Sequence, residues 1–375
     1  MGPTASLHLD SGREFRGAQR RVLYLVQGLA QRGHQAVLCC PRTSPLFARA
    51  EAAGLACSAL TLRSGLDFPS AVRLARLVRD APVDLVHAHD PQSHSIARAA
   101  QGISHERSLQ ANLFVTHHDV NDDHGGPGRL QHAGVHHIAS SRQIRDALVR
   151  RGVDAARIAV VPDGVDLGSV ERTGSANARD PWEFHARGLQ VVGTVGDLIR
   201  ERNQTVLLQA FVLLRAQNPD IHLLVVGDGP MRGVLEKRAR NLGVADAVTF
   251  AGRMEDAGAA YASMRVFVLS SDVEDPCSPV LDAMAAGAPV VTTAAAGVLG
   301  VARHGSSALV VPPRDPPALA HAITLVLGQP DLAARLVQGG RDMAAQHSVD
   351  HMVEATLAAY RGLGQFNDAA DPQRP

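Results

Sequence analysis

Short apolar runs alternate with helical patterns along most of this chain, and this alternation is the feature that most constrains its fold. Apolar runs of strand length separated by helices are typical of β-α-β units, which build parallel sheets. The expected strands are residues 5–9, 36–40, 85–87, 113–116, 135–139 and 158–161, then 190–195, 223–226, 248–250, 266–269 and 289–291. The expected helices are residues 20–32, 70–79, 93–101 and 141–151, with helical sequence again from 315 to 363. We therefore expect an α/β protein with two doubly wound parallel sheets.

The alternation is interrupted once, in a polar stretch without periodicity. At 375 residues the chain exceeds the size at which a single core keeps growing, so two domains are expected. The predicted organisation is a first domain over 1–166, a linker over 167–187 and a second domain over 188–348. A helix at 349–363 is predicted to pack back toward the first domain. The polar tail, 364–375, is predicted to be disordered.

Composition narrows the class of protein. With 37 basic and 37 acidic residues the net charge is zero, which argues against a nucleic-acid partner. No apolar run approaches the roughly 20 residues that span a bilayer. The N-terminus lacks a basic region followed by an apolar core, so we expect no secretory signal and a cytoplasmic location. The four cysteines lack C-x-x-C spacing and are expected to be neither a zinc site nor a disulfide framework; they are Cys39, Cys40, Cys57 and Cys277.

The most informative segment is residues 270–287, which follows a predicted strand and enters a predicted helix. Two of its four acids, Glu274 and Asp282, are separated by seven residues. Glu274 is expected on the loop and Asp282 about one turn into the helix, so both can face one ligand. The free backbone N–H groups and the dipole of a helix start suit an anionic group. This pattern indicates a binding site for an anionic ligand.

The segment resembles the donor-binding E-x7-E signature of the retaining family-4 glycosyltransferases, including the A-M-A-A-G that follows it. The resemblance implies the GT-B fold, in which two Rossmann-like domains face a cleft. It implies that Glu274 is catalytic and lies near the transferred sugar, and that Asp282, one methylene shorter than the family's Glu, holds the ribose hydroxyls. The residues implied to line the diphosphate and sugar are Ser278, Pro279, Val280 and Leu281.

Residues 195–203 are similar to the family's G-R-L loop and the Lys that follows it. The resemblance implies that Arg202, at the Lys position, binds the donor diphosphate. Asp197 stands where the family has Arg, which reverses a charge beside the expected phosphate site. Arg200 either substitutes by reaching across the loop or is a solvated side chain, and the sequence leaves both open.

Further segments extend the resemblance over nearly the whole chain. Gly227 belongs to a G-D-G-P turn after a strand. Gly252 and Arg253 belong to the F-x-G segment that cradles the nucleobase in the family. Gly17, on the loop entering the first helix, is implied to approach the donor or acceptor closely, although Arg16 replaces the first Gly of the family's G-G pair.

Two histidine-containing strand ends also match the family. Residues 84–90 are similar to its D-V-V-H-A-H segment, where the histidines are expected to pack. His118, in a V-T-x-H-D match, is implied to be catalytic by contacting the donor sugar or supporting the transition state. The neighbouring histidines lack metal-ligand spacing, so we expect no metal. Residues 163–166 are similar to the family's N-G-V-D hinge turn.

The resemblance implies a metal-independent transfer of a sugar from a nucleoside diphosphate sugar to an acceptor hydroxyl, with the nucleotide sugar as co-substrate and no other cofactor. The acceptor is expected to be a carbohydrate or a lipid-linked molecule, in polysaccharide or lipopolysaccharide synthesis. A same-fold phosphorylase or epimerase and a non-catalytic nucleotide-sugar-binding homologue stay open. Four arginines on one predicted helix either contact the inner membrane surface or form a solvated face; they are Arg142, Arg145, Arg150 and Arg151.

Overall fold

The computed structural model describes residues 4–65, 67–81, 83–118, 134–168, 181–254, 257–272, 278–295 and 298–364. The chain divides into two compact units, Met1–Gly164 with Val349–Pro375, and Val165–Ser348. Each unit contains one sheet in which every neighbouring pair of strands is parallel. Two doubly wound parallel sheets were predicted from the alternating pattern, and this prediction is confirmed.

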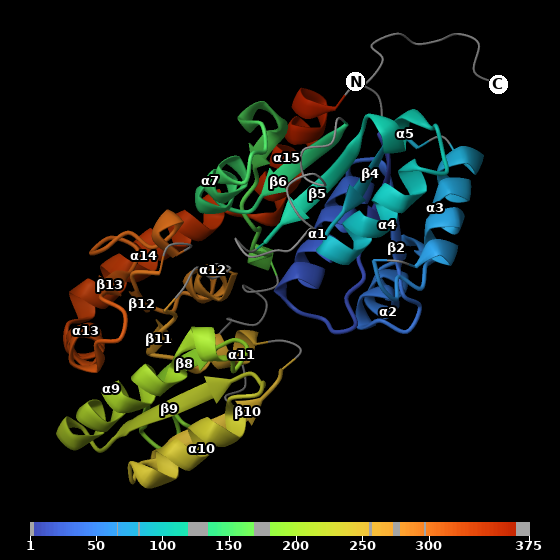
Figure 1. The fold of residues 1–375 in the computed structure, drawn as a ribbon. Helices are drawn as coiled ribbons and strands as arrows, with labels where there is room; N and C mark the ends of the chain where they lie inside the picture. Colours follow the sequence, from blue (N-terminus) through green and yellow to red (C-terminus); the bar gives the residue numbers. More distant parts are fainter. Residues whose placement is uncertain are drawn as a thin grey trace. The chain divides into compact units, whose positions relative to one another are not determined.

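The sheet of the first unit has the strand order β3-β2-β1-β4-β5-β6-β7 (Figure 1). Its strands are β1 (Ala5–Leu9), β2 (Gln35–Cys40), β3 (Ala56–Ala59), β4 (Leu85–Ala88), β5 (Leu113–His117), β6 (Val135–Ala139) and β7 (Ile158–Val160). Its helices are α1 (Gly17–Gln31), α2 (Pro45–Ala52), α3 (Phe68–Asp80), α4 (Pro91–Gln101), α5 (Arg107–Gln110), α7 (Arg142–Arg150) and α15 (Val349–Leu363). The order reverses between β1 and β4.

Helices cover both faces of this sheet, and the first unit has two large cores, with a smaller apolar cluster at α7. One core joins α1, α2 and α15 to the sheet, and the other joins α3, α4 and α5. Adjacent strand residues alternate between the two cores: Leu38 and Cys40 lie in the first and Cys39 in the second. Because both faces are buried, the strands read as continuous apolar runs, which explains why sequence pattern located most of them.

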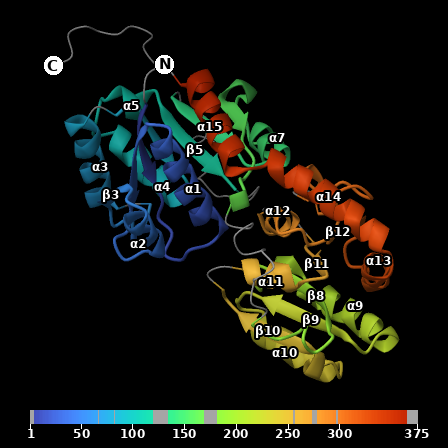
Figure 2. The same ribbon diagram turned by 180° about the vertical axis from the view of Figure 1, so that it is seen from behind.

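Helix α15 packs on α1 and β7, two elements that are distant from it in the sequence (Figure 2). Gly28 of α1 lies so close to Val353 that a side chain at position 28 would meet it at 2.5 Å. Arg32 at the end of α1 donates to Asp350 and Glu354, each at 2.8 Å. A small residue at the crossing and two ion pairs at its edge therefore position the last helix on the first unit.

The sheet of the second unit has the order β10-β9-β8-β11-β12-β13, reversing between β8 and β11. Its strands are β8 (Gln190–Val195), β9 (Ile221–Val226), β10 (Val248–Gly252), β11 (Val266–Leu269), β12 (Val290–Thr293) and β13 (Leu309–Val311). Its helices are α9 (Gln204–Gln217), α10 (Arg232–Asn241), α11 (Gly258–Ser263), α12 (Ser278–Ala285), α13 (Pro316–Gly328) and α14 (Pro330–Gln346). Val191 and Val192 point into the two different cores on its faces.

Several elements differ from the sequence prediction. The short strands β3 and β13 and the helices α2 and α5 were not predicted. Strand β3 has no β-branched residue and stays partly exposed at the sheet edge, so it carries little strand signal. Helix α1 begins at Gly17, three residues before the predicted start. The predicted disordered tail lies outside the described residues except for Gly364.

Part of the predicted linker has a defined place. The side chains of Trp182 and Phe184 stack with ring centroids 5.6 Å apart, and Phe184, 1% exposed, lies in a core of the second unit. A single buried aromatic residue in a polar stretch gives no periodicity to detect. Residues 169–180 of the predicted linker lie outside the described residues.

Candidate functional site

The reversal of strand order in the second unit brings together two of the segments that the sequence analysis selected. Doubly wound sheets bind ligands beyond the carboxyl ends of the strands, where the order reverses. The loop after β8 carries Arg202, and the loop after β11 begins the segment that leads to α12. Because β8 and β11 are neighbours, these loops lie side by side although about 70 residues separate them.

Several hydrogen bonds tie these two loops together. The Ser270 hydroxyl donates to the Arg202 carbonyl oxygen at 3.0 Å, and the Asp272 backbone N–H donates to the Glu201 carbonyl oxygen at 3.0 Å. The Asn203 side-chain amide donates to Asp272 Oδ1 at 2.8 Å. The backbone around Arg202 is therefore fixed by the loop that precedes α12.

The predicted glycines lie at the same edge of this sheet. Gly227 N–H donates to the Gly252 carbonyl oxygen at 2.8 Å, and Gly196 N–H donates to the Val226 carbonyl oxygen at 3.0 Å. Gly227 has a φ of 131°, and a Cβ there would collide with the Gly196 carbonyl oxygen. Gly227 is thus required by its conformation and by the close approach of two loops. The structure brings Gly227, Gly252 and Arg202 to one sheet edge.

The reversed charge at Asp197 lies near an arginine from another loop. The Asp197 carboxylate lies 4.0 Å from Nη2 of Arg253, which follows Gly252, and both side chains are partly exposed. The guanidinium carbon of Arg202 lies 3.6 Å from the place where a Cβ on Gly196 would be. Two arginines therefore lie near Asp197 at this edge, and no sequence motif indicated that Arg253 and Asp197 are neighbours.

Helix α12 begins beyond this edge and carries one of the two predicted acids. The side chains of Val280 and Leu281 are buried in the core, so only their backbone groups can serve a ligand. Pro279 has no N–H, which removes one donor from the first turn. Asp282 lies one turn after Ser278 and is 8% exposed. Glu274, the predicted catalytic acid, lies outside the described residues.

The corresponding edge of the first unit carries buried and half-buried acids and histidines. Asp10 directly follows β1, His89 and Asp90 follow β4, and the predicted catalytic His118 directly follows β5. Gly17, a predicted binding residue, is the exposed first residue of α1. The sequence analysis did not select Asp10 or Asp90, because a single acid after a strand is a common feature.

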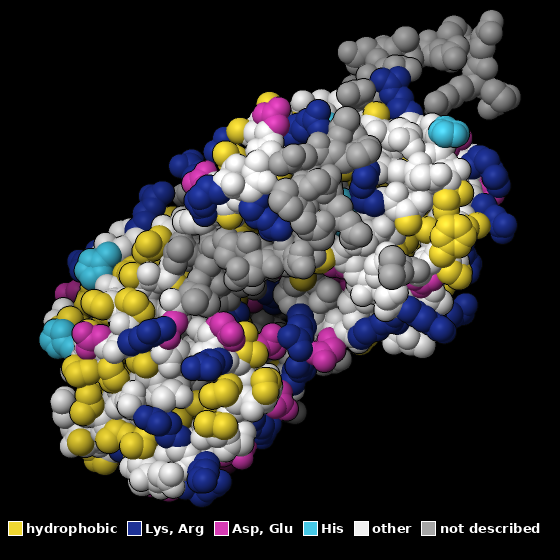
Figure 3. Space-filling model, in the orientation of Figure 1, with side chains coloured by type: hydrophobic (Ala, Val, Ile, Leu, Met, Phe, Trp, Pro, Cys, Tyr) yellow, Lys and Arg dark blue, Asp and Glu magenta, His cyan; other side chains and the backbone are white. Residues whose placement is uncertain are grey.

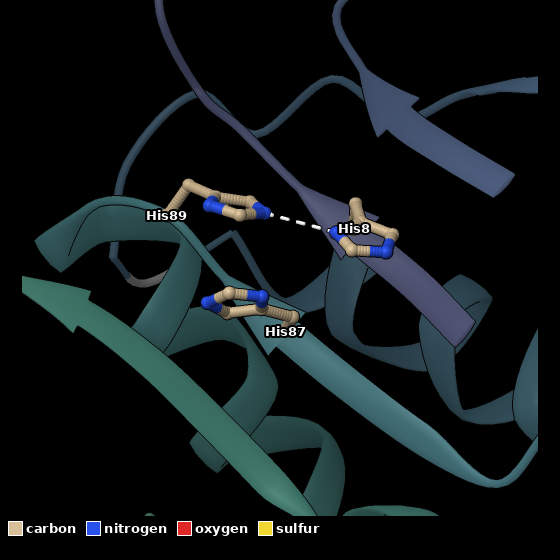
Figure 4. A group of neighbouring side chains, drawn as sticks. All are labelled: His8, His87 and His89. Atoms are coloured by element: carbon tan, nitrogen blue, oxygen red, sulfur yellow. Dashed lines mark hydrogen bonds between the residues drawn. The ribbon is translucent and has the colours of Figure 1, made fainter. Parts of the chain in front are cut away.

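Three imidazoles cluster where β1 and β4 pair (Figure 4). His8 and His87 are register partners, and His8 Nδ1 hydrogen bonds His89 Nε2 at 3.0 Å. Burial lowers the pKa of all three histidines, that of His8 to about 3. The cluster is therefore neutral at pH 7. The sequence analysis expected His87 and His89 to pack but had no means of placing His8 beside them.

Potential ligand atoms of these histidines lie within 4.8 Å of one another, so their fit to a metal ion can be tested. Both ring nitrogens of His87 already hydrogen bond hydroxyls, of Tyr360 and Thr116, at 2.7 Å. The second nitrogen of His8 bonds the Ser6 hydroxyl at 3.0 Å. The rings of His87 and His89 have centroids only 3.9 Å apart. A metal ion would have to displace this network, so the geometry favours a hydrogen-bonded stack over a metal site.

One buried ion pair anchors the predicted hinge turn to the first unit. Arg21 of α1, 4% exposed, pairs with Asp163 and also donates to the Val161 carbonyl oxygen at 3.1 Å. Burial by itself would raise the pKa of Asp163, but the Arg21 charge outweighs it and the net pKa is lowered. The pair therefore stabilises the first unit where its chain leaves the sheet.

The surface agrees with the balanced composition. On the face shown in Figure 3, basic side chains are scattered with acidic ones among them over the described residues. Within the described residues, no helix combines the length and the apolar character needed to cross a membrane.

Comparison with known proteins places both units in one class. Residues 15–169 match the family profile described as Glycosyltransferase Family 4, and residues 181–343 match the one described as Glycosyl transferases group 1. The structure of Anabaena Alr3699/HepE in complex with UDP and glucose aligns with a TM-score of 0.80 at 19% identity, over 95% of this chain and 99% of that one. This likeness shows the fold, which is GT-B.

Curated relatives match more locally. The lipopolysaccharide core biosynthesis glycosyltransferase LpsE of Rhizobium meliloti (strain 1021) is 32% identical over 168 residues, which is 44% of this chain and 48% of the relative. The D-inositol 3-phosphate glycosyltransferase of Corynebacterium urealyticum is 30% identical over 261 residues, which is 65% of this chain and 60% of the relative. The matches thus span between about half and three fifths of the length of these relatives. The chain belongs to the group 1 family of GT-B glycosyltransferases.

Proposed function

We propose that this chain transfers a sugar from a nucleoside diphosphate sugar to an acceptor hydroxyl, with retention at the anomeric carbon. The observation that carries the proposal is the edge between β8 and β11, where Arg202, Arg253, the glycine loops and the start of α12 gather. Cations and free helix N–H groups at one place suit a diphosphate. Family membership supports the same reading.

Each donor-site residue has a proposed role in this reaction. Arg202 and the backbone N–H groups of Ser278, Val280 and Leu281 stabilise the negative charge on the departing diphosphate, which lowers the barrier without a protein nucleophile. Gly227 keeps the adjacent loops close together. The backbone at Gly252 and Arg253 receives the nucleobase, and Asp282 binds the ribose hydroxyls. Pro279 fixes the first turn of α12.

Two further residues receive roles from the family resemblance alone. His118 and Glu274 are proposed to contact the transferred sugar and to support the transition state. The expected effect of His118→Ala is a fall in kcat of about a hundredfold or more, in the range found for lost transition-state hydrogen bonds. An unchanged kcat would remove His118 from the mechanism.

The acceptor is proposed to be a carbohydrate or a lipid-linked molecule in cell-surface polysaccharide or lipopolysaccharide synthesis, at the inner face of the cytoplasmic membrane. The name of one relative, a lipopolysaccharide core biosynthesis glycosyltransferase, supports this class of acceptor. Helix α7 presents exposed Arg142 and Arg150 with Val149 between them at 39% exposure, which suits an anionic surface. Sedimentation with anionic vesicles at low salt tests the contact, and equal binding to neutral vesicles would count against it.

A protein that binds nucleotide sugars without turnover is the second candidate, and Asp197 is the observation that favours it. A carboxylate beside the proposed diphosphate site opposes turnover more than binding, because the negative charge on the diphosphate grows as it departs. The variant Asp197→Arg restores the family's charge. If only this variant releases nucleoside diphosphate, the natural chain is the binding protein; if the natural chain also turns over, it is the enzyme.

A panel of nucleoside diphosphate sugars, screened by thermal shift and by nucleoside diphosphate release, tests the proposal. A ligand at a hundred times its Kd stabilises the native state by about 2.7 kcal/mol, which is easily detected. The expected result is that one donor stabilises the natural chain but not Arg202→Ala. The matched control is Arg215→Ala, since Arg215 bonds carbonyl groups at the other end of β9. Failure of every donor at millimolar concentration would overturn the proposal.

A further inference from the structure

The loop between β1 and α1 is held by two carboxylates at the point where the strand order of the first unit reverses. Asp10, fully buried, accepts a hydrogen bond from Gly12 N–H at 2.9 Å. Asp90 accepts four, from the backbone N–H and the hydroxyl of both Ser11 and Ser93, at 2.6–2.8 Å. Asp90 accepts hydrogen bonds from groups that can donate in the same way at any charge of Asp90. Asp10 has one further partner, a side-chain amide that can either donate or accept.

That partner is Gln19 of α1, which links Asp10 to the start of its own helix. Gln19 Nε2 lies 3.2 Å from Asp10 Oδ2, and Gln19 Oε1 accepts a hydrogen bond from Arg16 N–H at 3.3 Å. Gly12 covers the contact so closely that a Cβ there would lie 2.5 Å from Gln19 Nε2 and 2.8 Å from Asp10 Oδ1. The side chains of Asp10 and Gln19 thus join β1 to the N-terminal cap of α1.

The direction of these bonds depends on the charge of Asp10. A glutamine amide has one donating end and one accepting end. While Asp10 is a carboxylate, Gln19 donates to it, and its oxygen is left for Arg16 N–H. Gln19 Nε2 lies 3.2 Å from Asp10 Oδ2 and 3.4 Å from Oδ1, and Oδ1 already accepts a hydrogen bond from Gly12 N–H. A proton on Oδ2 makes this oxygen a donor, and it then needs the Gln19 oxygen for itself. Turning the amide then places an NH2 group against Arg16 N–H, and two donors cannot bond.

The Asp10 carboxyl gains or loses its proton near neutral pH. Burial, and next the charge of Asp90, raise the pKa of Asp10 to about 7, against the opposing hydrogen bonds from Gly12 and Gln19. The other titratable groups beside it are neutral at that pH: the pKa of Cys40 on β2 is raised to about 12, and that of His8 on β1 is lowered to about 3. The charge that acts on Asp10 is therefore that of Asp90.

We propose that Asp10 is a positioning residue that holds the Arg16–Gly17 turn in place through Gln19 as a carboxylate, and releases it as an acid. The contact needs no substrate to form. Its consequence for binding rests on the proposed function, in which Gly17 approaches the donor or acceptor. On that basis, affinity for the ligand of this loop rises with pH as Asp10 loses its proton.

We call the contacts from Asp10 through Gln19 to Arg16 N–H the latch. Hydrogen exchange at the Arg16 amide, measured at pH 6 and pH 8.5 and corrected for intrinsic rates, tests it directly. The expected protection of the natural chain is about fivefold higher at pH 8.5, the effect of one net hydrogen bond. Asp10→Asn presents an NH2 group to Gln19 and imitates the acid, so its protection should be low at both pH values. Full protection in this variant at pH 8.5, or no pH effect in the natural chain, would overturn the proposal.

Two further variants separate the latch from general loosening. Gln19→Met keeps the bulk of the side chain but cannot accept from Arg16 N–H, so it should expose this amide at both pH values. Asp84→Asn is the matched control, because Asp84 accepts from Ala5 N–H at 2.8 Å at the opposite end of β1. It should retain the pH dependence of the natural chain, and loss of that dependence in Asp84→Asn would refute the specific role of Asp10.

The pH profile of KM then connects the latch to the reaction. The natural chain should show a KM that falls between pH 6 and 8.5, and Asp10→Asn a KM that does not change. If the exchange results hold but no nucleoside diphosphate is released, the proposed function fails and the latch stands. If turnover is found while the exchange rate at the Arg16 amide changes neither with pH nor in Asp10→Asn, the latch proposal is wrong and the proposed function is retained.

Discussion

The two units have the same strand order around the point where the order reverses, but different kinds of side chain lie at that point. The first unit places ionisable groups there: buried His8 and His87 within the sheet, and buried His89, buried Asp10 and half-buried Asp90 beyond it. The second unit places glycine loops, partly exposed arginines and a helix start there.

This difference shows that the scaffold fixes where a site lies but not what the site does. Buried neutral histidines and a carboxyl with a raised pKa make the first unit sensitive to pH. Backbone donors and arginines, which do not titrate near neutrality, make the second unit suited to a permanent anion. Each prediction below changes one side of this contrast.

The largest expected effect is a selective loss of stability of the first unit in acid. The folded-state pKa values of His8, His87 and His89 lie below the unfolded value of about 6.5, so the unfolded chain binds more protons and stability falls as pH drops below 6.5. Each unit of pKa shift is worth about 1.4 kcal/mol. Protonation of Asp10 stabilises the folded state as pH falls from about 7 to 4, because its pKa is raised to about 7. This opposes the effect of the histidines, but it is one group against three.

Hydrogen exchange followed by mass spectrometry at pH 7 and pH 5 measures the loss of stability in acid for each unit separately. The second unit has a smaller expected response, since among its described histidines only His222 shows a lowered pKa, to about 4. His8→Gln should flatten the pH response of the first unit even if it lowers stability at pH 7. An equal loss of protection in both units would contradict the contrast.

The next effect concerns catalysis in the second unit. Arg202→Ala should lower kcat/KM by about a hundredfold to a thousandfold, because a preorganised donor to the departing diphosphate is removed. Steady-state release of nucleoside diphosphate measures it. A loss of less than about threefold would mean that Arg202 does not contact the diphosphate.

The third effect is on the buried ion pair of the first unit. Asp163→Asn should lower the free energy of unfolding by about 3 kcal/mol, because it leaves the Arg21 charge buried without its partner. Urea denaturation measures it. An Arg21→Met, Asp163→Asn double variant, which removes the charge itself, should recover part of the loss.

The smallest effect is on the exposed ion pair of the second unit. Asp197→Asn should change the free energy of unfolding by less than about 1 kcal/mol, because partly exposed pairs are screened by solvent. The same urea titration compares it with Asp163→Asn. A loss as large as that of the buried pair would show that Asp197 has a structural role.

The sequence located most elements of the fold for a definite reason. Strands buried on both faces, such as β8 and β11, are continuous apolar runs, and their predicted bounds are those of the structure. Edge strands such as β3, and short helices such as α5, bury too little to leave a pattern. The start of α1 was placed at Arg20 because the helical signal in residues 17–19 rests on Gln19, a polar residue that is buried.

A donor site was predicted from motifs, and four of its residues lie together at one edge of the second sheet, whereas Gly17 lies on α1 of the first unit. Arg202, Gly227, Gly252 and Arg253 each follow a strand or a turn that the pattern had marked. The contact between Arg253 and Asp197 was not predicted, because no local rule pairs residues on loops more than 50 positions apart.

The sequence by itself determined that there are two parallel α/β sheets and which loops leave their strands, because hydrophobic periodicity and glycine turns are local properties. Only the tertiary structure decided which side chains meet. His8 faces His87 because β1 and β4 are paired in register, and Asp10 reaches Gln19 because the chain turns back over Gly12. Strand order and register bring such residues together across the sheet, and the charge of each then depends on how fully its neighbours exclude water.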